Sequence, residues 1–260
     1  MTLDHELVDA GGGRRLDRFA EVLIDRPAPG ADAPPVLPGA AWQAADGRFD
    51  RSTGWNWRTT PPEGWAVELD GLAFALRPAE AGQVGLFPEQ AIQWPWLAER
   101  PRGPVLNLFA YTGATTLALA RIGNAVTHVD ASRTALTWAR ENAARNGLAE
   151  SPIRWILDDV ADFVGREARR ARKYRGAILD PPTYGHGPGG RAWRIERDLP
   201  GLLESTRAVL EPDGWLVVTT HTRGLDLREL VGQGETGTLE LRGTSGATLS
   251  AGHYVRWPAS

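Results

Sequence analysis

The sequence contains no cysteine among its 260 residues. Without a thiol, the chain has no disulfides, no thiolate metal sites and no reaction that depends on a cysteine nucleophile. The five histidines show no spacing typical of metal ligands, so we expect no metal site. No apolar run is long enough to span a membrane, and the first residues lack the charged and then apolar pattern of a secretory signal. We therefore expect a cytoplasmic protein that is not attached to a membrane.

The charge balance argues against a surface that is basic throughout. The formal net charge is −3, which leaves room only for a local basic face. A hydrophobic fraction of 42% is enough to form a core, and 260 residues are enough for one domain with a smaller appendage. The sequence carries no signal for an oligomeric state.

The N-terminal third is typical of a small β-rich region. Residues 65–76 show apolar alternation with Asp70-Gly71 at the centre, which is a strong signal for a tight β-hairpin. A stretch rich in Pro, Gly and Ala, residues 26–39, predicts an irregular connection before it. We therefore predict a β-rich region over residues 1–85 and a second domain over residues 86–260.

Four tryptophans fall within the predicted β-rich region: Trp42, Trp55, Trp57 and Trp65. Packing of these rings in a core is the favoured interpretation. Stacking on nucleobases is the alternative.

From residue 102 onward, short apolar strands alternate with amphipathic helices. This alternation predicts parallel βαβ units with right-handed crossovers, closed by a final hairpin over residues 237–257. Ligands in such sheets bind at the carboxyl ends of the strands. The five strands before the hairpin are predicted over residues 105–109, 125–130, 153–157, 176–180 and 215–220.

The first two strand ends carry a glycine loop and an aspartate. The first strand runs into a loop that ends at Gly113 just before a helix, where glycine lets the backbone approach a ligand closely. The loop lacks the full Gly-x-Gly-x-x-Gly pattern, so it fits a dinucleotide pyrophosphate poorly. Asp130 ends the second strand, where a carboxylate can accept hydrogen bonds from ribose hydroxyls. An acid that only stabilises the N-terminus of the next helix is the alternative for Asp130.

The third and fourth strand ends also carry acids. Asp158 and Asp159 follow the third strand; one could accept the amino group of an adenine while the other caps a helix, and Asp159 is preferred for adenine. The fourth strand ends in Asp-Pro-Pro-Thr-Tyr, residues 180–184. Paired prolines hold the backbone extended, so they present a carboxylate and an aromatic ring on a rigid strand end. A purely structural turn could use the same prolines.

Two of these motifs resemble a known family. Asn-Leu-Phe-Ala-Tyr-Thr-Gly over residues 107–113, followed in order by the Asp-Pro-Pro motif, resembles the class I S-adenosylmethionine (SAM)-dependent methyltransferases. The pair is most similar to the bacterial ribosomal RNA large-subunit methyltransferases of the I and K/L types, over residues 85–222. The resemblance implies an α/β, Rossmann-like fold: a mostly parallel seven-stranded sheet with helices on both faces, beside a small β-rich N-terminal appendage. It also implies SAM as the cofactor.

A further segment of that family precedes the first strand and helps to enclose the cofactor. Family members carry Thr-Gly-x-Phe-x-Asp-Gln-Arg there. In this chain Phe87 and Gln90 match, Glu89 is a conservative change, and Ala91 departs from the arginine.

The resemblance and the strand ends together nominate three sets of site residues. The predicted cofactor-binding residues are Phe87, Gln90, Asn107, Phe109, Ala110, Tyr111, Thr112, Gly113, Asp130, Ala131, Ser132, Asp158, Asp159 and Asp180. The predicted catalytic residues are Asp180, Pro181, Tyr184 and His221. The predicted substrate-binding residues are Arg191, Trp193 and Arg194.

The missing cysteine narrows the chemistry that the resemblance implies. Family members that methylate C5 of cytosine use a cysteine in the turn after the fifth strand, where this chain has Thr-Thr-His-Thr over residues 219–222. A nitrogen or oxygen acceptor remains. By analogy with nitrogen methyltransferases, Asp180 and the Pro181 carbonyl would accept hydrogen bonds from the target amine, and Tyr184 would stack on its ring. His221 could be a base or an orienting group, or it could be structural.

Two basic clusters bear on the substrate. One lies on and after the helix predicted over residues 160–172, where a solvated face paired with acids such as Glu167 is an equally good interpretation. The other includes Arg191 and Arg194 beside the Asp-Pro-Pro motif, where arginines suit phosphate contacts and Trp193 could stack on a base. We therefore predict an RNA, with ribosomal RNA favoured, as the substrate. A small-molecule methyltransferase and a SAM-binding protein without catalysis are the alternatives.

Overall fold

The computed structural model describes residues 5–79, 81–186, 192–232 and 234–258. These residues form two compact units, which are described separately. The first contains the described residues of Met1–Ala91 and Leu239–Ala251, and the second those of Ile92–Thr238 and Gly252–Ser260. The chain therefore passes into the second unit a few residues after the predicted boundary, and the turn half of its last hairpin returns to the first.

The first unit is built on a five-stranded sheet in the order β1-β2-β3-β4-β5. Neighbouring strands are antiparallel except β3 and β4, which are parallel and are joined through α1 (Gly39–Gln43). A separate hairpin pairs β6 (Ala66–Leu69) with β7 (Leu72–Ala75) around Asp70-Gly71, as predicted, and both turn residues have the positive φ that such turns need. The five strands of the sheet are β1 (His5–Gly11), β2 (Arg14–Phe19), β3 (Val22–Pro27), β4 (Gly47–Asp50) and β5 (Gly54–Trp57).

The tryptophans of this unit pack as core residues. Trp42 and Trp65 are buried, which confirms the packing interpretation for these two. Trp55 and Trp57 are half-buried and stack on each other with ring centroids 4.9 Å apart. Gly47 has to be a glycine because a Cβ there would lie 2.2 Å from the Trp57 ring.

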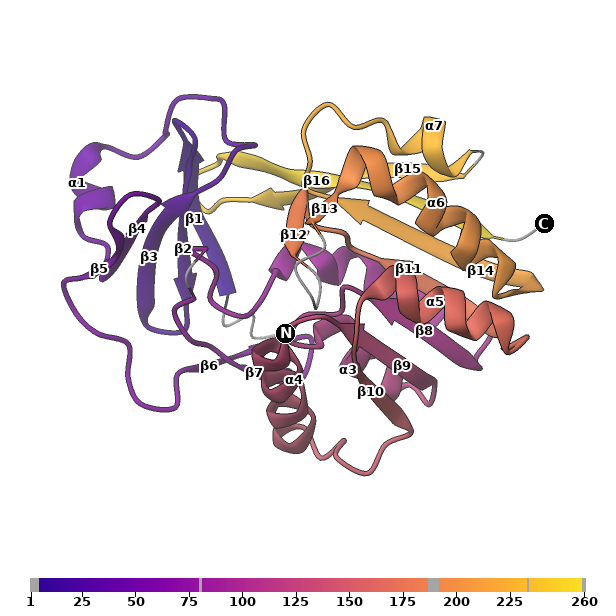
Figure 1. The fold of residues 1–260 in the computed structure, drawn as a ribbon. Coiled ribbons are helices and arrows are strands. Elements are labelled where there is room, and N and C mark those ends of the chain that lie inside the picture. The colour runs from indigo at the N-terminus through magenta and orange to yellow at the C-terminus, as the bar shows by residue number, and fades with distance from the viewer. Residues whose placement is uncertain (1–4, 80, 187–191, 233, 259–260) are drawn as a thin grey trace. The chain divides into compact units, whose positions relative to one another are not determined.

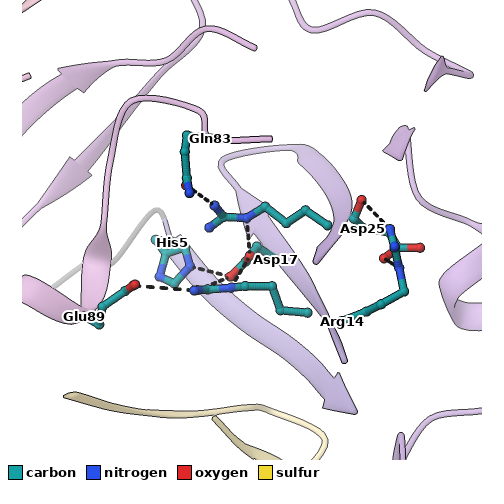
Figure 2. Close-up of polar contacts among 8 residues, drawn as sticks. His5, Arg14, Asp17, Asp25, Gln83 and Glu89 are labelled. Atoms are coloured by element: carbon teal, nitrogen blue, oxygen red, sulfur yellow. Dashed lines mark hydrogen bonds and ion pairs between the residues drawn. The ribbon is translucent and has the colours of Figure 1, made fainter. Parts of the chain in front are cut away.

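A cluster of charged side chains is buried in the same unit (Figure 2). The Asp17 carboxylate, with no exposed surface, accepts hydrogen bonds from Arg15 (2.7 Å), Arg26 (3.0 Å) and His5 (3.0 Å). Burial by itself raises the pKa of Asp17, but the two guanidinium groups and His5 outweigh it and hold the pKa well below its usual range. We call these residues, with Gln83 and Glu89 that contact the two arginines, the Asp17 cluster.

The second unit is built on a seven-stranded sheet in the order β10-β9-β8-β11-β14-β16-β15. The first five strands of that order run parallel, and β16 is antiparallel to β14. The predicted parallel units and closing hairpin are therefore confirmed. The strands are β8 (Pro104–Leu108), β9 (Ala125–Asp130), β10 (Ile153–Leu157), β11 (Tyr174–Leu179), β14 (Leu210–Thr220), β15 (Glu235–Arg242) and β16 (Thr248–Pro258).

Helices cover both faces of this sheet, as predicted. On one face α5, α6 and α7 pack against the apolar side chains of β8, β11 and β14, and Figure 1 shows α5 beside α6. On the other face, α3 and α4 contact β9. The helices of the unit are α2 (Trp94–Ala98), α3 (Ala114–Arg121), α4 (Arg133–Arg145), α5 (Val160–Arg169), α6 (Ile195–Ala208) and α7 (Leu227–Val231), preceded by the short 3₁₀ helix η1 (Pro88–Gln93). Within the described segments, no helix combines the length and the apolar character that a membrane span requires.

The parallel strands bring their carboxyl ends to one edge of the sheet. Backbone hydrogen bonds continue past the strands there: Ala110 donates to Val129, and Asp158 donates to Asp130. The central strands are buried on both faces, which is why they read as continuous apolar runs in the sequence.

Candidate cofactor site and active site

The loop between β8 and α3 is held in an unusual conformation. Phe109 (φ 57°), Tyr111 (φ 49°) and Gly113 (φ 88°) are all left-handed, which is uncommon for residues other than glycine. The Asn142 side chain, from α4, donates to the Thr112 carbonyl at 3.0 Å and helps to hold the loop. Strained backbone of this kind clusters at ligand sites.

A buried polar chain lies beneath the loop. The Asn107 side chain donates to Thr116 Oγ1 at 2.9 Å, and that hydroxyl lies 2.9 Å from His128 Nδ1. Burial lowers the pKa of His128 to about 3, so its imidazole is neutral near neutral pH. Asn107 therefore supports the loop from below through Thr116, and its predicted contact with the cofactor stays a proposal.

Asp130 lies at the end of β9 beside this loop. Its carboxylate accepts the backbone amides of Tyr111 and Ser132, each at 2.8 Å. Burial raises the pKa of Asp130 in spite of hydrogen bonds from the backbone amides of Ser132, Tyr111 and Ala131. A carboxylate has about four acceptor positions, so these donors leave part of its capacity for a hydroxyl. Ser132 caps α4 by accepting the Ala135 amide at 3.2 Å, a role typical of serine at the start of a helix.

The two aspartates after β10 divide their roles differently from the preferred assignment. Asp159 caps α5, because its Oδ1 accepts the Asp162 amide at 3.0 Å. Asp158 forms an ion pair with Arg166. Asp159, the residue predicted to bind adenine, is thus the helix cap. Only its second oxygen is left for the adenine amino group.

Asp180 follows β11 and meets the end of β14. The buried Thr219 hydroxyl donates to Asp180 Oδ1, and His221 Nε2 lies 3.6 Å from the same oxygen. The side chains of Asp180 and His221 are 24% and 31% exposed, so a ligand can reach both. The structure therefore brings the predicted residues Asp180 and His221 together.

The backbone acceptors around Asp180 are mostly occupied. The Pro182 carbonyl accepts the Trp193 indole N–H at 2.7 Å, and the Thr183 carbonyl accepts the Ile195 amide at 3.2 Å. Among the described residues, no donor contacts the Pro181 carbonyl or Asp180 Oδ2. Two acceptors at this strand end are thus left for a ligand.

A short hairpin beside the strand end carries the predicted substrate residues. Tyr184, in β12 (Tyr184–His186), pairs with Arg194 in β13 (Ala192–Arg194). The Tyr184 side chain is 64% exposed, and the Arg194 guanidinium lies 5.8 Å from the centre of its ring. Trp193 is half-buried and packs against Phe109 of the cofactor loop, with ring centroids 5.0 Å apart. Arg191 lies outside the described residues.

Part of the basic cluster on and after α5 is paired with acids. Arg170 contacts Glu167 at 3.1 Å, and Arg175 pairs with Glu211 at 3.0 Å and with Asp213. These pairs favour the interpretation of this cluster as a solvated helix face.

The segment with Phe87 and Gln90 belongs to the first unit, where the Gln90 amide donates to the Phe87 carbonyl at 3.0 Å. Glu89 of this segment is buried and lies 3.6 Å from Arg15 of the Asp17 cluster.

Thr219 is not among the functional residues predicted from the sequence. Residues 219–222 enter that prediction only as the turn in which the cysteine of related enzymes is missing. Thr222 is missed in the same way, although its hydroxyl contacts that of Thr183 at 2.8 Å. The one signal in the sequence was a run of hydroxyl side chains around His221 at the end of the fifth strand.

Comparison with known proteins agrees with this arrangement. The family model described as S-adenosylmethionine-dependent methyltransferase matches residues 39–222. A crystal structure of a SAM-dependent methyltransferase from Agrobacterium tumefaciens is similar over 99% of this chain and 91% of its own, with a TM-score of 0.90 and 36% sequence identity.

Two curated relatives are ribosomal RNA large subunit methyltransferases K/L. The protein from Methylococcus capsulatus is 36% identical over 166 residues, which are 63% of this chain and 22% of the relative. The protein from Shewanella frigidimarina is 32% identical over 161 residues, which are 60% of this chain and 22% of the relative. The matched part thus spans about a fifth of the length of these relatives.

The residues present fit SAM. Asp130 can accept ribose hydroxyls, and Gly113 lets the loop over residues 109–113 pack closely against α4, since a Cβ there would lie 3.1 Å from Ala139 Cβ. The strand-end acceptors lie on the same sheet edge. The fold, these acceptor groups and the family match agree. The chain therefore belongs to the S-adenosylmethionine-dependent methyltransferases, enzymes that use SAM as cofactor.

Proposed function

We propose that this enzyme methylates a nitrogen of an RNA base, with ribosomal RNA as the substrate. The observation that carries the proposal is the pair of acceptors at the end of β11, Asp180 Oδ2 and the Pro181 carbonyl, beside the exposed ring of Tyr184. An amino group has two N–H donors, and these two acceptors can hold both. Tyr184 can stack on the heterocycle that carries the amine.

The chain's task in this reaction is alignment. Bound SAM supplies a methyl group on a positively charged sulfur, which is electrophilic without further activation. The two acceptors hold the nitrogen so that its lone pair points at the methyl carbon. As the N–C bond forms and the C–S bond breaks, the nitrogen releases a proton. Asp180 Oδ2 is placed to accept that proton, and His221 lies 3.6 Å from the other oxygen of the same carboxylate.

The absence of cysteine supports nitrogen over carbon as the acceptor atom. Methylation of cytosine C5 by the covalent route needs a thiolate to attack the base, and the chain has no thiol. Asp180 instead accepts from the Thr219 hydroxyl and lies 3.6 Å from the His221 imidazole, two groups that can orient a carboxylate.

The cofactor contacts follow the strand ends. We propose that Asp130 binds the ribose hydroxyls and that the second oxygen of Asp159 binds the adenine amino group. The remaining proposed contacts are those of Phe87, Gln90, Asn107, Phe109, Ala110, Tyr111, Thr112, Gly113, Ala131, Ser132, Asp158 and Asp180.

An RNA substrate is supported by the stacked pair of Tyr184 and Arg194, since a ring beside a guanidinium suits a base with its phosphate. We propose Trp193 of the same hairpin, and Arg191, as further substrate contacts. The names of the K/L relatives point the same way. A small-molecule substrate is the second candidate, and the pairing of Arg170 and Arg175 with acids favours it.

The test is transfer of labelled methyl from SAM to fractions of total RNA and to a metabolite extract, followed by nucleoside mass spectrometry. We expect an N-methylated nucleoside in ribosomal RNA. The Asp180→Asn variant should lose this product, whereas Asp213→Asn, which removes an exposed carboxylate of the same unit, should keep it.

Each other outcome contradicts part of the proposal. A product of 5-methylcytidine would contradict the nitrogen acceptor. Label confined to metabolites would favour the small-molecule candidate. SAM binding without transfer to either fraction would favour a protein that binds SAM without catalysis.

A further inference from the structure

Two threonine contacts join the loops that follow β11 and β14. Thr219, the penultimate residue of β14, donates its hydroxyl to Asp180 Oδ1. Beyond it, the hydroxyls of Thr183 and Thr222 lie 2.8 Å apart. Both contacts join residues 39 positions apart in the chain, so only the fold brings them together.

The first of these contacts decides which oxygen of Asp180 is available. An aspartate carboxylate rotates readily about its last side-chain bond. Without a donor to hold it, Asp180 would therefore present neither oxygen to a ligand in a defined orientation. Thr219 has no exposed surface and is held in a buried strand, where its hydroxyl lies closer to Asp180 Oδ1 than to its other acceptor, the Leu179 carbonyl at 3.4 Å. With Oδ1 taken by Thr219 and flanked by His221, Oδ2 is the oxygen left for a ligand.

The second contact fixes the backbone of the same loop. The Thr183–Thr222 contact holds the residue that follows the two prolines, while the carbonyls of Pro182 and Thr183 are occupied by Trp193 and Ile195. The Pro181 carbonyl is thereby held beside the carboxylate. Residues 219–222 thus hold the two acceptors, Asp180 Oδ2 and the Pro181 carbonyl, in place.

We propose that Thr219 is a positioning residue for methyl transfer, because it orients Asp180 so that Oδ2 and the Pro181 carbonyl together receive the target amine. This inference rests on the proposed nitrogen methylation. In this role Thr219 touches neither the cofactor nor the substrate and acts on the reaction through Asp180.

Three substitutions isolate the hydroxyl. Thr219→Val keeps the shape and removes the donor, Thr219→Ser keeps the donor, and Thr219→Ala removes both the donor and the methyl group. Thr206→Val is the matched control, because Thr206 is equally buried but donates its hydroxyl to the Leu202 carbonyl inside α6 instead of to an active-site carboxylate.

For Thr219→Val and Thr219→Ala we expect kcat to fall about ten- to a hundredfold, as for misplaced catalytic groups. The KM for the acceptor and the Kd for SAM should stay within about twofold of wild type, since binding and alignment are separable. Thr219→Ser and Thr206→Val should retain most of kcat. Circular dichroism and SAM binding establish that each variant is folded.

The outcomes separate the two proposals. If the wild-type enzyme methylates nitrogen while Thr219→Val and Thr219→Ala keep its kcat, the positioning role is wrong and the proposed function stands. Equal losses in Thr219→Ser and Thr219→Ala would assign the effect to packing and also overturn it. A wild-type enzyme that transfers methyl to no nitrogen would overturn the proposed function and this inference with it.

Discussion

Two clusters of polar side chains in this protein centre on an aspartate. Asp17 lies in the sheet of the first unit, with three side chains donating to its carboxylate and no exposed surface. Asp180 lies at a strand end of the second unit, with one side-chain donor on one oxygen and part of its surface exposed. The first carboxylate has its hydrogen-bonding capacity filled by the protein, whereas the second keeps an acceptor open for a ligand.

The comparison shows why charge and burial alone do not identify a functional site. The Asp17 cluster contains two arginines, an aspartate, a glutamate and a histidine within a small buried volume (Figure 2). Breaking such a cluster lowers the free energy of unfolding because it leaves buried charge uncompensated. The Asp17 cluster therefore serves the stability of the fold. The group of side chains around Asp180 carries less charge, and its open acceptor oxygen can bind a ligand.

The largest effect should come from Asp17→Asn. This change leaves Arg15 and Arg26 without their shared counterion, and we expect the free energy of unfolding to fall by about 3–5 kcal/mol. Urea unfolding checks the value. Because Asp17 has a lowered pKa, its contribution is present above the usual aspartate pKa and is lost as the pH falls, so the wild type should destabilise in acid more steeply than the variant. Equal stability of the two proteins would contradict the account of this cluster.

A smaller effect is expected on cofactor affinity in Asp130→Ala. Removing a charged acceptor for the ribose hydroxyls should weaken SAM binding about ten- to a hundredfold by isothermal titration calorimetry. Asp130 has a raised pKa, and the hydroxyls donate to its charged form. SAM affinity of the wild type should therefore fall as the pH is lowered through that raised pKa. The variant should lack this pH dependence; a wild-type affinity that is flat across that pKa would argue against the ribose contact.

For Asp180→Asn we expect little change in stability beside a large loss of activity. The asparagine oxygen can still accept from Thr219, and the side chain is partly exposed, so the free energy of unfolding should change by about 1 kcal/mol or less. The same urea series used for Asp17→Asn measures it. A loss as large as that of Asp17→Asn would place Asp180 among the structural carboxylates.

The smallest effect is expected for Arg18→Gln. Arg18 pairs with Glu6 at 3.4 Å in the same sheet as Asp17, but its side chain is 43% exposed. Exposed ion pairs contribute little, so stability should change by about 0.5 kcal/mol or less. Measured beside Asp17→Asn, this variant shows whether burial or charge pairing decides how much stability is lost when an ion pair is broken.

Several features of the site could be read from neighbouring residues. The Asp70-Gly71 turn, the Ser132 cap and the strands that end in Asp130 and Asp180 all follow from local patterns and are found in the structure. Other features could not be read this way. Both Asp158 and Asp159 are acidic residues at one strand end, and only the geometry of α5 decides that Asp159 caps the helix.

The sequence alone determined the alternation of strands and helices after residue 102, the acids at the strand ends and the exclusion of thiol chemistry, because each depends on residue type or on short-range periodicity. Tertiary structure decided which oxygen of Asp180 stays open, that Asn107 supports the cofactor loop from below, and that the charged residues of the first unit form one buried cluster. The physical reason is that hydrogen-bond partners far apart in the chain are selected by how strands and loops pack, and local patterns carry no record of that packing.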